Sequence, residues 1–407
     1  MISESDGRFM RQALSLARRG IGNVEPNPPV GCVIVAPSRD ESKTNDASDP
    51  GYVVIGRGYH RRFGGPHAEI DAIADSRAND DANGRSRLAG ATAYVSLEPC
   101  CHHGKTPPCT DAIIAAGIAR VVVATEDPFD RVAGGGIAAL RAAGIEVDVG
   151  VCRREAETLL APFRRRVVDG RAFVIAKWAM TIDGRIATRT GQSQWITGAR
   201  ARDDVHRTRA TLDAIVTGMG TVRADDPQLT ARVDIEHLRN RPPAVRWVMC
   251  QNSLPAIDSR LVATLDRAPL VLCVAGRLRD AAMSWRDRVA EQRGFADRVS
   301  IVAVDHANDA SPDAIDRTMV EGLVDHVSNA GMTRVLIEGG GRLMASFFRR
   351  DAIDACHVYI GGSVFGGTTS PGPVGGSGVD AIADAARFRC VQTETFDDDV
   401  KLTYHRR

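Results

Sequence analysis

Two short stretches of the sequence gather side chains that could bind a metal and move a proton. Residues 98–109 read EPCCHHGKTPPC, and residues 64–73 read GGPHAEIDAI. A hydrolytic zinc site requires three protein ligands, a fourth position open to water, and a base beside that water. Cysteine and histidine are zinc ligands, and the glutamate two positions after the histidine is a candidate base. The two stretches together therefore contain the parts of such a site.

The elements expected around these stretches would bring the candidate ligands together. Pro66 favours a helix start, so His67 and Glu69 would lie in the first turn, where a metal above the helix end is within reach of both. Cys109 begins the helical pattern CTDAIIAAGI, whereas Cys100 follows the strand pattern ATAYVSLEP. Helix N-termini stabilise thiolates. The candidate ligands are thus expected where strand ends meet helix starts.

Taken separately, each motif has an ordinary explanation, because a helical histidine is usually a satisfied polar residue and cysteines beside prolines could be small buried hydrophobic residues. Together, HAE, EPC and HHGKTPPC match the zinc nucleobase deaminase signature, but eight residues separate Cys100 from Cys109 where that signature usually has two. This spacing, with NPPVGCVIV (27–35) and GYHRRFGGPHAE (58–69), resembles the bifunctional riboflavin-biosynthesis deaminase/reductases. In that family a cytidine-deaminase-like α/β/α domain is fused to a reductase.

The resemblance implies a role for each matching residue. The implied zinc ligands are His67, Cys100 and Cys109. Glu69 would carry a proton from water to the departing amine. The positions matching the family's pyrimidine and ribose-phosphate site are Asn27, His60, His102 and Lys105. Cys101 and His103 fall where the family accepts other residues, and we expect them to have no role.

The second half of the chain contains a glycine-rich turn between a strand and a helix, VLIEGGGRLMASFF (335–348). Such a turn lets backbone N–H groups and a helix N-terminus approach a phosphate, although the glycines could equally serve packing. The polar segments 181–198 and 216–232 follow strands, where ligands bind in α/β sheets. These segments resemble the family's reductase domain, which is similar to dihydrofolate reductase in fold and uses NADPH.

The same resemblance assigns the reductase residues. The positions implied to contact NADPH are Ala179, Trp195, Thr221, Asp225, Leu229, Gly340, Gly341, Arg342, Leu343, Met344, Ala345 and Ser346. Those implied to contact the substrate are Ser193, Arg209, Arg232 and Glu338, with Lys177 and Asp225 as further candidates at the reacting end. One stretch departs from the family, since WVMCQNSL (247–254) has Cys250 and Gln251 where an Asp-Ser pair is usual. We expect NADPH binding to survive through the remaining contacts.

Composition limits the class of protein. The 407 residues exceed one ordinary core and fit two domains. Hydrophobic residues at 43% and charged residues at 25% are typical of soluble globular proteins, and a net charge of +1 gives no electrostatic footprint for nucleic acid. Nine scattered cysteines favour a reducing cytoplasm. The charged N-terminus lacks the apolar core of a signal peptide, and no apolar run is long enough to span a membrane.

Alternating strand and helix patterns predict two α/β domains. We expect a deaminase domain at residues 1–150, a linker helix at 151–170, and a reductase domain at 171–407 whose sheet is mostly parallel with late antiparallel strands. An amphipathic helix capped by Ser5 or Asp6 opens the first domain. The polar stretches 37–51 and 75–90 are expected as loops.

Two other functions fit parts of the sequence. A zinc deaminase of polynucleotide bases would splay out its target nucleotide, but the near-neutral charge and the reductase-like half argue against it. A purely structural zinc module would need a fourth ligand from Cys101, His102 or His103. The favoured function is a bifunctional enzyme of riboflavin synthesis that acts on phosphorylated pyrimidines. The resemblance also implies a homo-oligomer formed through the reductase domain.

Overall fold

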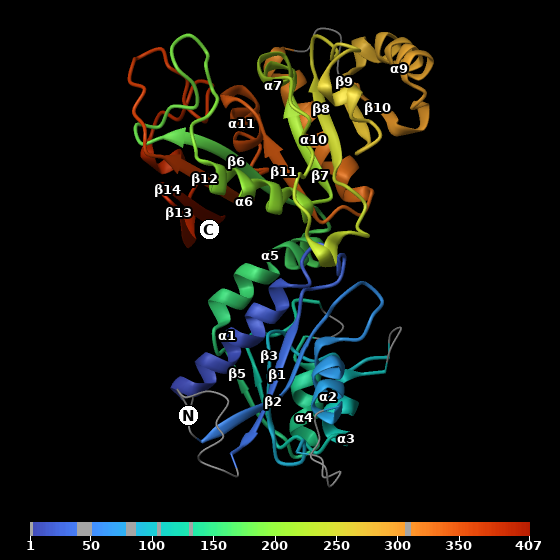
Figure 1. The fold of residues 1–407 in the computed structure, drawn as a ribbon, viewed down its shortest axis with the longest axis vertical. Coiled ribbons are helices and arrows are strands. Elements are labelled where there is room, and N and C mark those ends of the chain that lie inside the picture. Colours follow the sequence, from blue (N-terminus) through green and yellow to red (C-terminus); the bar gives the residue numbers. More distant parts are fainter. Residues whose placement is uncertain (1–2, 39–50, 79–86, 104–106, 130–132, 306–310) are drawn as a thin grey trace. The chain divides into compact units, whose positions relative to one another are not determined.

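The computed structural model describes residues 3–38, 51–78, 87–103, 107–129, 133–305 and 311–407. The chain forms two compact units, Met1–Gly170 and Arg171–Arg407, each with α/β layers (Figure 1). The helix expected as a linker, α5 (Arg153–Asp169), is part of the first unit, where its Ala156, Leu160 and Phe163 are buried. No helix of the described residues is both long and apolar enough to cross a membrane.

The first unit is built on a five-stranded sheet with the order β2-β1-β3-β4-β5. β1 is antiparallel to β2 and β3, whereas β3, β4 and β5 are parallel. α1 and α5 cover one face, and α2, α3 and α4 cover the other (Figure 1). The elements besides α5 are α1 Glu4–Arg18, β1 Gly31–Pro37, β2 Tyr52–Tyr59, α2 Ala68–Ala78, β3 Thr92–Val95, α3 Cys109–Ala115, β4 Arg120–Val123, α4 Gly135–Ala142 and β5 Glu146–Val149.

The first helix is capped by Ser3, so the expected cap at Ser5 or Asp6 is wrong. Ser3 Oγ accepts a hydrogen bond from the Asp6 N–H at 3.2 Å, and Asp6 Oδ2 accepts one from the Ser3 N–H at 2.8 Å, which makes a capping box. Asp6 also accepts hydrogen bonds from Tyr94 and Arg120 of the sheet, both at 2.8 Å. The cap therefore ties the start of α1 to the sheet.

Gly58 in β2 allows α2 to lie close against the sheet. A Cβ atom at this position would be 2.3 Å from the Ala68 carbonyl oxygen and 2.3 Å from the Ala72 nitrogen, both in α2. We expect Gly58→Ala to displace α2 and to lower the free energy of unfolding by about 1–3 kcal/mol, the usual cost of overpacking. Urea unfolding followed by circular dichroism measures this change.

Gly7→Ala in α1 is the matched control for that substitution. The nearest atom to a Cβ at Gly7 is 3.4 Å away, in the flexible side chain of Arg11. Because alanine is the better helix former, this variant should be more stable by about 0.5–1 kcal/mol. Equal destabilisation by the two substitutions would contradict the close-contact explanation.

The second unit contains a nine-stranded sheet with the order β10-β9-β8-β7-β11-β6-β12-β14-β13. The seven strands from β10 to β12 in this order are parallel, and β14 and β13 are antiparallel to their neighbours, as predicted. The strands are β6 Phe173–Thr181, β7 Ala214–Gly218, β8 Val245–Cys250, β9 Leu270–Ala275, β10 Val299–Val304, β11 Arg334–Glu338, β12 Ala355–Gly361, β13 Phe388–Phe396 and β14 Asp399–Arg406.

Helices pack on both faces of this sheet. α10 and α11 bury side chains such as Met319 and Phe347 in the main core, together with Cys356 and Val358 of β12. α6 packs against Tyr359 of the same strand, which points to the opposite face. The helices are α6 Ala199–Ala210, α7 Met219–Asp225, α8 Arg260–Ala263, α9 Arg279–Arg293, α10 Pro312–Asn329 and α11 Gly341–Phe348, with single 3₁₀ turns at Glu236–Leu238, Gly276–Leu278, Ala296–Arg298 and Ile382–Asp384.

Candidate active sites

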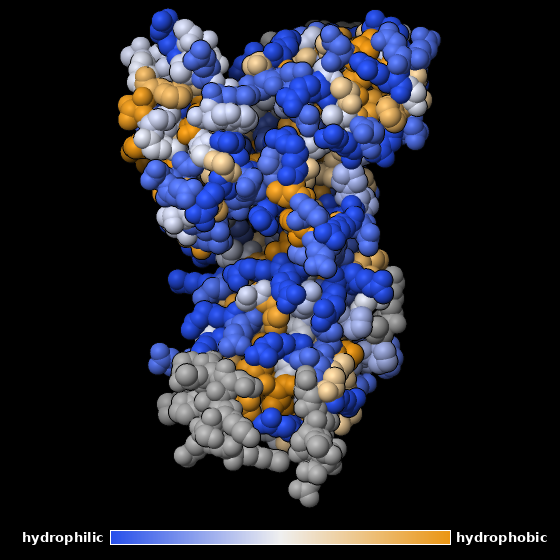
Figure 2. Space-filling model, viewed as in Figure 1, coloured by the Kyte–Doolittle hydropathy of each residue, from blue (hydrophilic) through white to orange (hydrophobic). Residues whose placement is uncertain are grey.

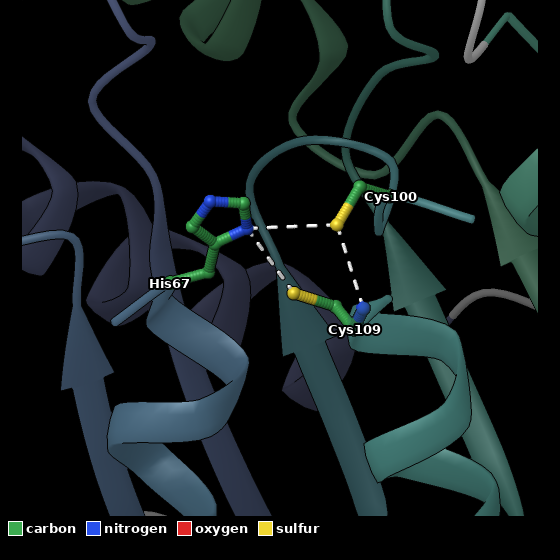
Figure 3. Close-up of side chains that lie close together, drawn as sticks. All are labelled: His67, Cys100 and Cys109. Carbon is green, nitrogen blue, oxygen red and sulfur yellow. Dashed lines mark hydrogen bonds between the residues drawn. The ribbon is translucent and has the colours of Figure 1, made fainter. Parts of the chain in front are cut away.

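The three predicted zinc ligands lie together in the first unit (Figure 3). His67 immediately precedes α2, Cys109 is the first residue of α3, and Cys100 lies in the segment after β3. Their ligand atoms are all within 4.8 Å of one another. His67 Nδ1 is 3.5 Å from Cys100 Sγ and 3.3 Å from Cys109 Sγ. One imidazole nitrogen facing two sulfurs suits zinc, so the residues fit the metal.

Hydrogen bonds to the Cys100 sulfur favour its thiolate form. The Cys109 side chain contacts it, and the Cys109 N–H donates to it at 3.4 Å. These bonds and His67 lower the pKa of the Cys100 thiol to about 4, although burial opposes the change. The contact with Cys100 in turn raises the pKa of His67. A thiolate is the form of cysteine that binds metals.

Glu69 lies in the first turn of α2, beside the three predicted ligands. Its side chain is only 4% exposed. It interacts with both cysteines and with His67, and burial raises the pKa of its carboxyl to about 7. A group with a pKa near the working pH can both accept and donate a proton.

Asn27 and His60 form a polar pair next to His67. The His60 and His67 rings are edge to face, with 5.3 Å between their centroids. His60 Nδ1 is 2.8 Å from the Pro66 carbonyl oxygen, so this nitrogen carries the proton, and Nε2 accepts from Asn27 Nδ2 at 3.3 Å. Burial lowers the pKa of His60, which favours this neutral form.

The other two predicted deaminase contacts lie in the segment between β3 and α3. His102 is exposed, and Lys105 lies outside the described residues. His102 interacts electrostatically with Asp127, a residue that the sequence analysis missed. Burial raises the pKa of Asp127 to about 6. Its position was a usable signal, because an acidic residue shortly after the strand pattern ARVVVAT lies at the carboxyl edge of the sheet.

Glu98 is a second residue that the sequence analysis missed. It is 3% exposed, and its carboxylate accepts four backbone N–H bonds at 2.9–3.1 Å, from Asp127, Gly134, Gly136 and Ile137. Glu98 therefore ties the start of α4 to the segment that carries Cys100. In the EPC motif, the sequence analysis assigned a role to Cys100 and none to Glu98.

The predicted reductase residues surround one cleft of about 1130 Å³ in the second unit. It lies at the carboxyl ends of β6, β7 and β11 and is bordered by α6, α7 and α11. In Figure 2 the upper edge of this unit is notched between the loops that follow β6 and β12 and the part that carries α7. Ordinary ligand pockets have about 300–1,000 Å³, so the cleft is large enough for a dinucleotide with a second ligand.

The cleft brings together all but one of the predicted reductase residues. Those that line it are Lys177, Ala179, Ser193, Trp195, Arg209, Thr221, Asp225, Leu229, Arg232, Glu338, Gly340, Gly341, Arg342, Leu343, Ala345 and Ser346. The exception is Met344, whose side chain is fully buried in the core. Met344 and Phe347 lie on the face of α11 that packs on the sheet, so the Met344 side chain contacts the core and not the cleft.

The start of α11 fits a phosphate group. Gly340 precedes the helix and makes no side-chain cap, and a Cβ at this position would meet nothing within 4 Å. Thr221 Oγ1 accepts the Gly340 N–H at 3.2 Å, which holds the turn in place. Backbone N–H groups at a helix N-terminus bind anions. The residues present therefore fit a dinucleotide cofactor.

A buried carboxylate joins two of the predicted substrate residues. Arg209 Nε and Nη2 donate to the two Glu338 oxygens at 2.7 and 2.6 Å, and Lys177 Nζ is 3.9 Å from Glu338 Oε2. Burial opposes ionisation of Glu338, but Arg209 and Lys177 outweigh it and lower the pKa of the carboxyl to about 2. Glu338 is therefore ionised, and it holds the positively charged side chains of Arg209 and Lys177 at the cleft.

Comparison with known proteins identifies both units. The model of the cytidine and deoxycytidylate deaminase zinc-binding region matches residues 3–125, and the model of the RibD C-terminal domain matches residues 172–402. The chain is 35% identical over 401 residues to riboflavin biosynthesis protein RibD of Actinobacillus pleuropneumoniae, with 98% of this chain and 95% of that protein covered. The chain belongs to the RibD family.

RibD relatives match along the whole chain. RibD of Aquifex aeolicus is 32% identical over 406 residues, with both proteins fully covered. The solved structure of Acinetobacter baumannii RibD has a TM-score of 0.72 at 30% identity and 99% coverage of both chains. A diaminohydroxyphosphoribosylaminopyrimidine deaminase/5-amino-6-(5-phosphoribosylamino)uracil reductase from Thermotoga maritima has a TM-score of 0.72 at 31% identity and 98% coverage of both. The predicted fold class is confirmed, as is a bifunctional deaminase and reductase of riboflavin biosynthesis.

The stretch that departs from the RibD pattern divides between core and cleft. Cys250 is fully buried in β8, whereas Gln251, Asn252 and Ser253 line the cleft. Arg223 Nη1 donates to Ser253 Oγ at 2.8 Å. Of Cys250 and Gln251, which stand where the family usually has an Asp-Ser pair, only Gln251 lines the cleft. The sequence analysis singled out the stretches 216–232 and 247–254 but not the individual residues Arg223, Asn252 and Ser253 within them.

Cys101 adjoins Cys100 but is not part of the three-ligand cluster. Its Sγ lies toward Gly135 at the start of α4, 2.9 Å from where a Cβ of that glycine would be. We therefore expect Cys100→Ser to lose most of the bound zinc and Cys101→Ser to retain it. Metal analysis of the purified variants measures the difference, and equal losses would contradict the ligand assignment.

Proposed function

We propose that this RibD family member catalyses two successive reactions. The first unit would hydrolytically deaminate 2,5-diamino-6-ribosylamino-4(3H)-pyrimidinone 5′-phosphate. The second unit would use NADPH to reduce the ribosyl group of 5-amino-6-(5-phosphoribosylamino)uracil to ribityl. The observation that carries the proposal is the cluster of His67, Cys100 and Cys109 beside buried Glu69. The Thermotoga relative, named for these two activities, supports it.

The ligand count favours a catalytic zinc site over a structural one. Among the residues that the structure describes, which include Cys101, His102 and His103, the cluster contains three ligands. Structural zinc sites have four protein ligands, whereas catalytic sites have three and leave one position for water. The alternative of a purely structural zinc module is therefore disfavoured.

Glu69 is the proposed proton carrier of the deamination. Zinc, when bound by His67, Cys100 and Cys109, supplies the Lewis acidity that lowers the pKa of water to about 7. Glu69 would take a proton from water and deliver it to the departing amine. Its burial shields that proton from bulk solvent.

The other polar residues of the first unit are proposed to bind the substrate. Asn27 and His60 present an amide and a ring to the pyrimidine beside the metal ligands. His102 and Lys105 would contact the ribose phosphate, for which a lysine ammonium is a suitable point charge.

The cleft of the second unit is the proposed reductase site. NADPH, when bound, supplies the hydride. The turn from Gly340 to Ser346, with Thr221, would bind its phosphates. Arg232 suits the substrate phosphate by charge and fork geometry. Arg209 would contribute its charge, since its Nε and Nη2 already donate to Glu338. Lys177, whose Nζ is 3.9 Å from Glu338 Oε2, would hold a proton at the reacting end, and the ionised Glu338 would keep it in place.

Ammonia release and NADPH oxidation, measured in one vial with zinc-loaded protein and the diaminopyrimidinone phosphate, test the proposal. We expect equal amounts of both. Ammonia without NADPH oxidation would mean that the altered 247–254 stretch has cost the second activity. Neither signal would reject the proposed function.

NADPH binding should saturate below millimolar concentration in spite of Cys250 and Gln251. Quenching of the fluorescence of Trp178 and Trp195, which both line the cleft, measures binding. Gly340→Asp is the control, because the open space there accommodates the side chain while its carboxylate repels a phosphate. No saturation of the unmodified protein at millimolar cofactor would contradict the prediction.

A homo-oligomer formed through the second unit and a cytoplasmic location remain predictions. Light scattering coupled to size-exclusion chromatography measures the first. A monomeric mass at micromolar concentration would contradict it.

A further inference from the structure

His206 lines the reductase cleft but belongs to none of the residue sets assigned above. It lies on α6 between Arg202 and Arg209, which also line the cleft. The residue is 8% exposed, and its Nδ1 atom is buried and has no hydrogen-bond partner in the described part of the chain. A buried polar atom without a partner is costly. A ligand in the cleft would supply the missing partner.

The surroundings of His206 carry an excess of positive charge. Arg209 and Arg232 act on the ring electrostatically, as does the carboxylate of Glu338. Glu338 already binds Arg209 and lies near Lys177 of β6. For Arg232, no ion pair with an acidic side chain is present among the described residues, and Arg260 and Arg267 add further positive charge. An anion beside Arg232 would balance this charge.

One polar residue of the sheet that packs against α6 already has its hydrogen-bond partners. Tyr359 of β12 packs against α6 and lines the cleft. Its hydroxyl donates to Asp204 Oδ2 at 2.6 Å, and Lys401 Nζ is 2.7 Å from the same oxygen. Tyr359, Asp204 and Lys401 thus bind one another. His206 and Arg232 are the groups that we consider as ligand contacts.

The hydrogen bond of the His206 ring decides what it can bind. The ring interacts with the Thr230 backbone carbonyl, and because Nδ1 has no partner, Nε2 is the donor. A neutral imidazole has a single N–H, so Nδ1 is an acceptor in the free protein. Burial and the two arginines lower the pKa of His206 to about 4, which keeps it neutral at pH 7. Nδ1 therefore needs a proton before it can donate to a phosphate oxygen.

We propose that His206, together with Arg232, binds the phosphate of the reductase substrate and takes up a proton from solvent as the phosphate binds. The inference rests on the proposed function of the second unit and adds a residue to its substrate site. A phosphate dianion between the two side chains favours the protonated ring. Phosphate is thus held best below the pKa that His206 has in the complex, and affinity falls as the pH rises through that value.

Calorimetric titration of the full chain with ribose 5-phosphate at pH 7.0, in two buffers of different ionisation enthalpy, counts the protons taken up. We expect proton uptake by the unmodified protein and none by His206→Gln. The affinity of the variant for ribose 5-phosphate should be lower by a factor of about ten or more. His237→Gln is the matched control, because it replaces an exposed histidine of the same unit that does not line the cleft. It should behave like the unmodified protein.

Steady-state kinetics with the phosphorylated uracil substrate and NADPH give a second readout. His206→Gln should raise KM about tenfold with a much smaller effect on kcat, and the rise of KM with pH should disappear. If His206 only packed against its neighbours, His206→Gln would leave the number of protons taken up and the pH dependence of KM unchanged.

Two results would overturn the proposal. Weaker binding of ribose 5-phosphate by His206→Gln with unchanged proton uptake would show that neutral Nδ1 accepts from a hydroxyl and does not bind phosphate. Failure of the unmodified protein to bind ribose 5-phosphate saturably would also reject it. Neither result depends on turnover, so lost NADPH oxidation with intact proton-linked binding would reject the proposed reduction and support the role of His206.

Discussion

Glu69→Gln is expected to keep its zinc and to lose deaminase activity by a factor of about 10² to 10⁴, the range supplied by a positioned general acid or base. The amide has nearly the same shape as the carboxyl but cannot carry a proton. Glu69 is 4% exposed and lies two residues after the predicted ligand His67. Ammonia release from the diaminopyrimidinone phosphate measures the loss, and metal analysis measures the zinc.

Asp111→Asn is the matched control for this variant. Asp111 lies two residues after the predicted ligand Cys109, as Glu69 does after His67, but it is exposed on α3. We expect full ammonia release from Asp111→Asn. Reduction of the deaminated substrate with NADPH should be unchanged in both variants. Ammonia release at the normal rate by Glu69→Gln, or zinc loss that accounts for its inactivity, would reject Glu69 as the proton carrier.

The parts of the deaminase site that follow from local sequence were predictable. Pro66 and Pro108 mark the starts of α2 and α3, so the placement of His67 and Cys109 follows from short-range rules. The cap of α1 was not, because Ser3, Ser5 and Asp6 are all suitable cap residues in sequence. The choice of Ser3 depends on Asp6 being buried against Tyr94, which is distant along the chain.

Residues that act through long-range contacts could not be found from the sequence. His206 lies in an ordinary helical pattern, ARARDDVHRTRA. Its candidate role becomes visible only in the folded protein, where Thr230 and Glu338 interact with the ring. Asp127 and Glu98 likewise gain their environment from each other and from the start of α4. Met344 shows the opposite case. A run of consecutive positions was assigned to the cleft, but the helical period turns this side chain into the core.

Glu338→Gln is expected to destabilise the second unit by about 3–5 kcal/mol, the cost of removing one partner from a buried ion pair, and to abolish NADPH oxidation. The substitution leaves the guanidinium of Arg209 and the ammonium of Lys177 without their counter-charge. Urea unfolding followed by tryptophan fluorescence measures this unit alone, because all four tryptophans, Trp178, Trp195, Trp247 and Trp285, lie within it.

Asp234→Asn provides the comparison for an exposed ion pair in the same unit. Asp234 Oδ2 is 2.6 Å from Arg239 Nη2, but the two side chains are 66% and 60% exposed, so solvent screens the pair and the loss of stability should be far smaller than for Glu338→Gln. The pH dependence separates charge from packing. The pKa of Glu338 is about 2 in the folded protein and about 4.3 in an unfolded chain. Its stabilising contribution is therefore complete above the unfolded value and is lost as the pH falls toward 2. The stability difference between the unmodified protein and Glu338→Gln should shrink over that range, since a protonated glutamate and a glutamine are both neutral. A difference that stays constant on acidification would show that packing of the side chain, and not its charge, holds Arg209 and Lys177 at the cleft.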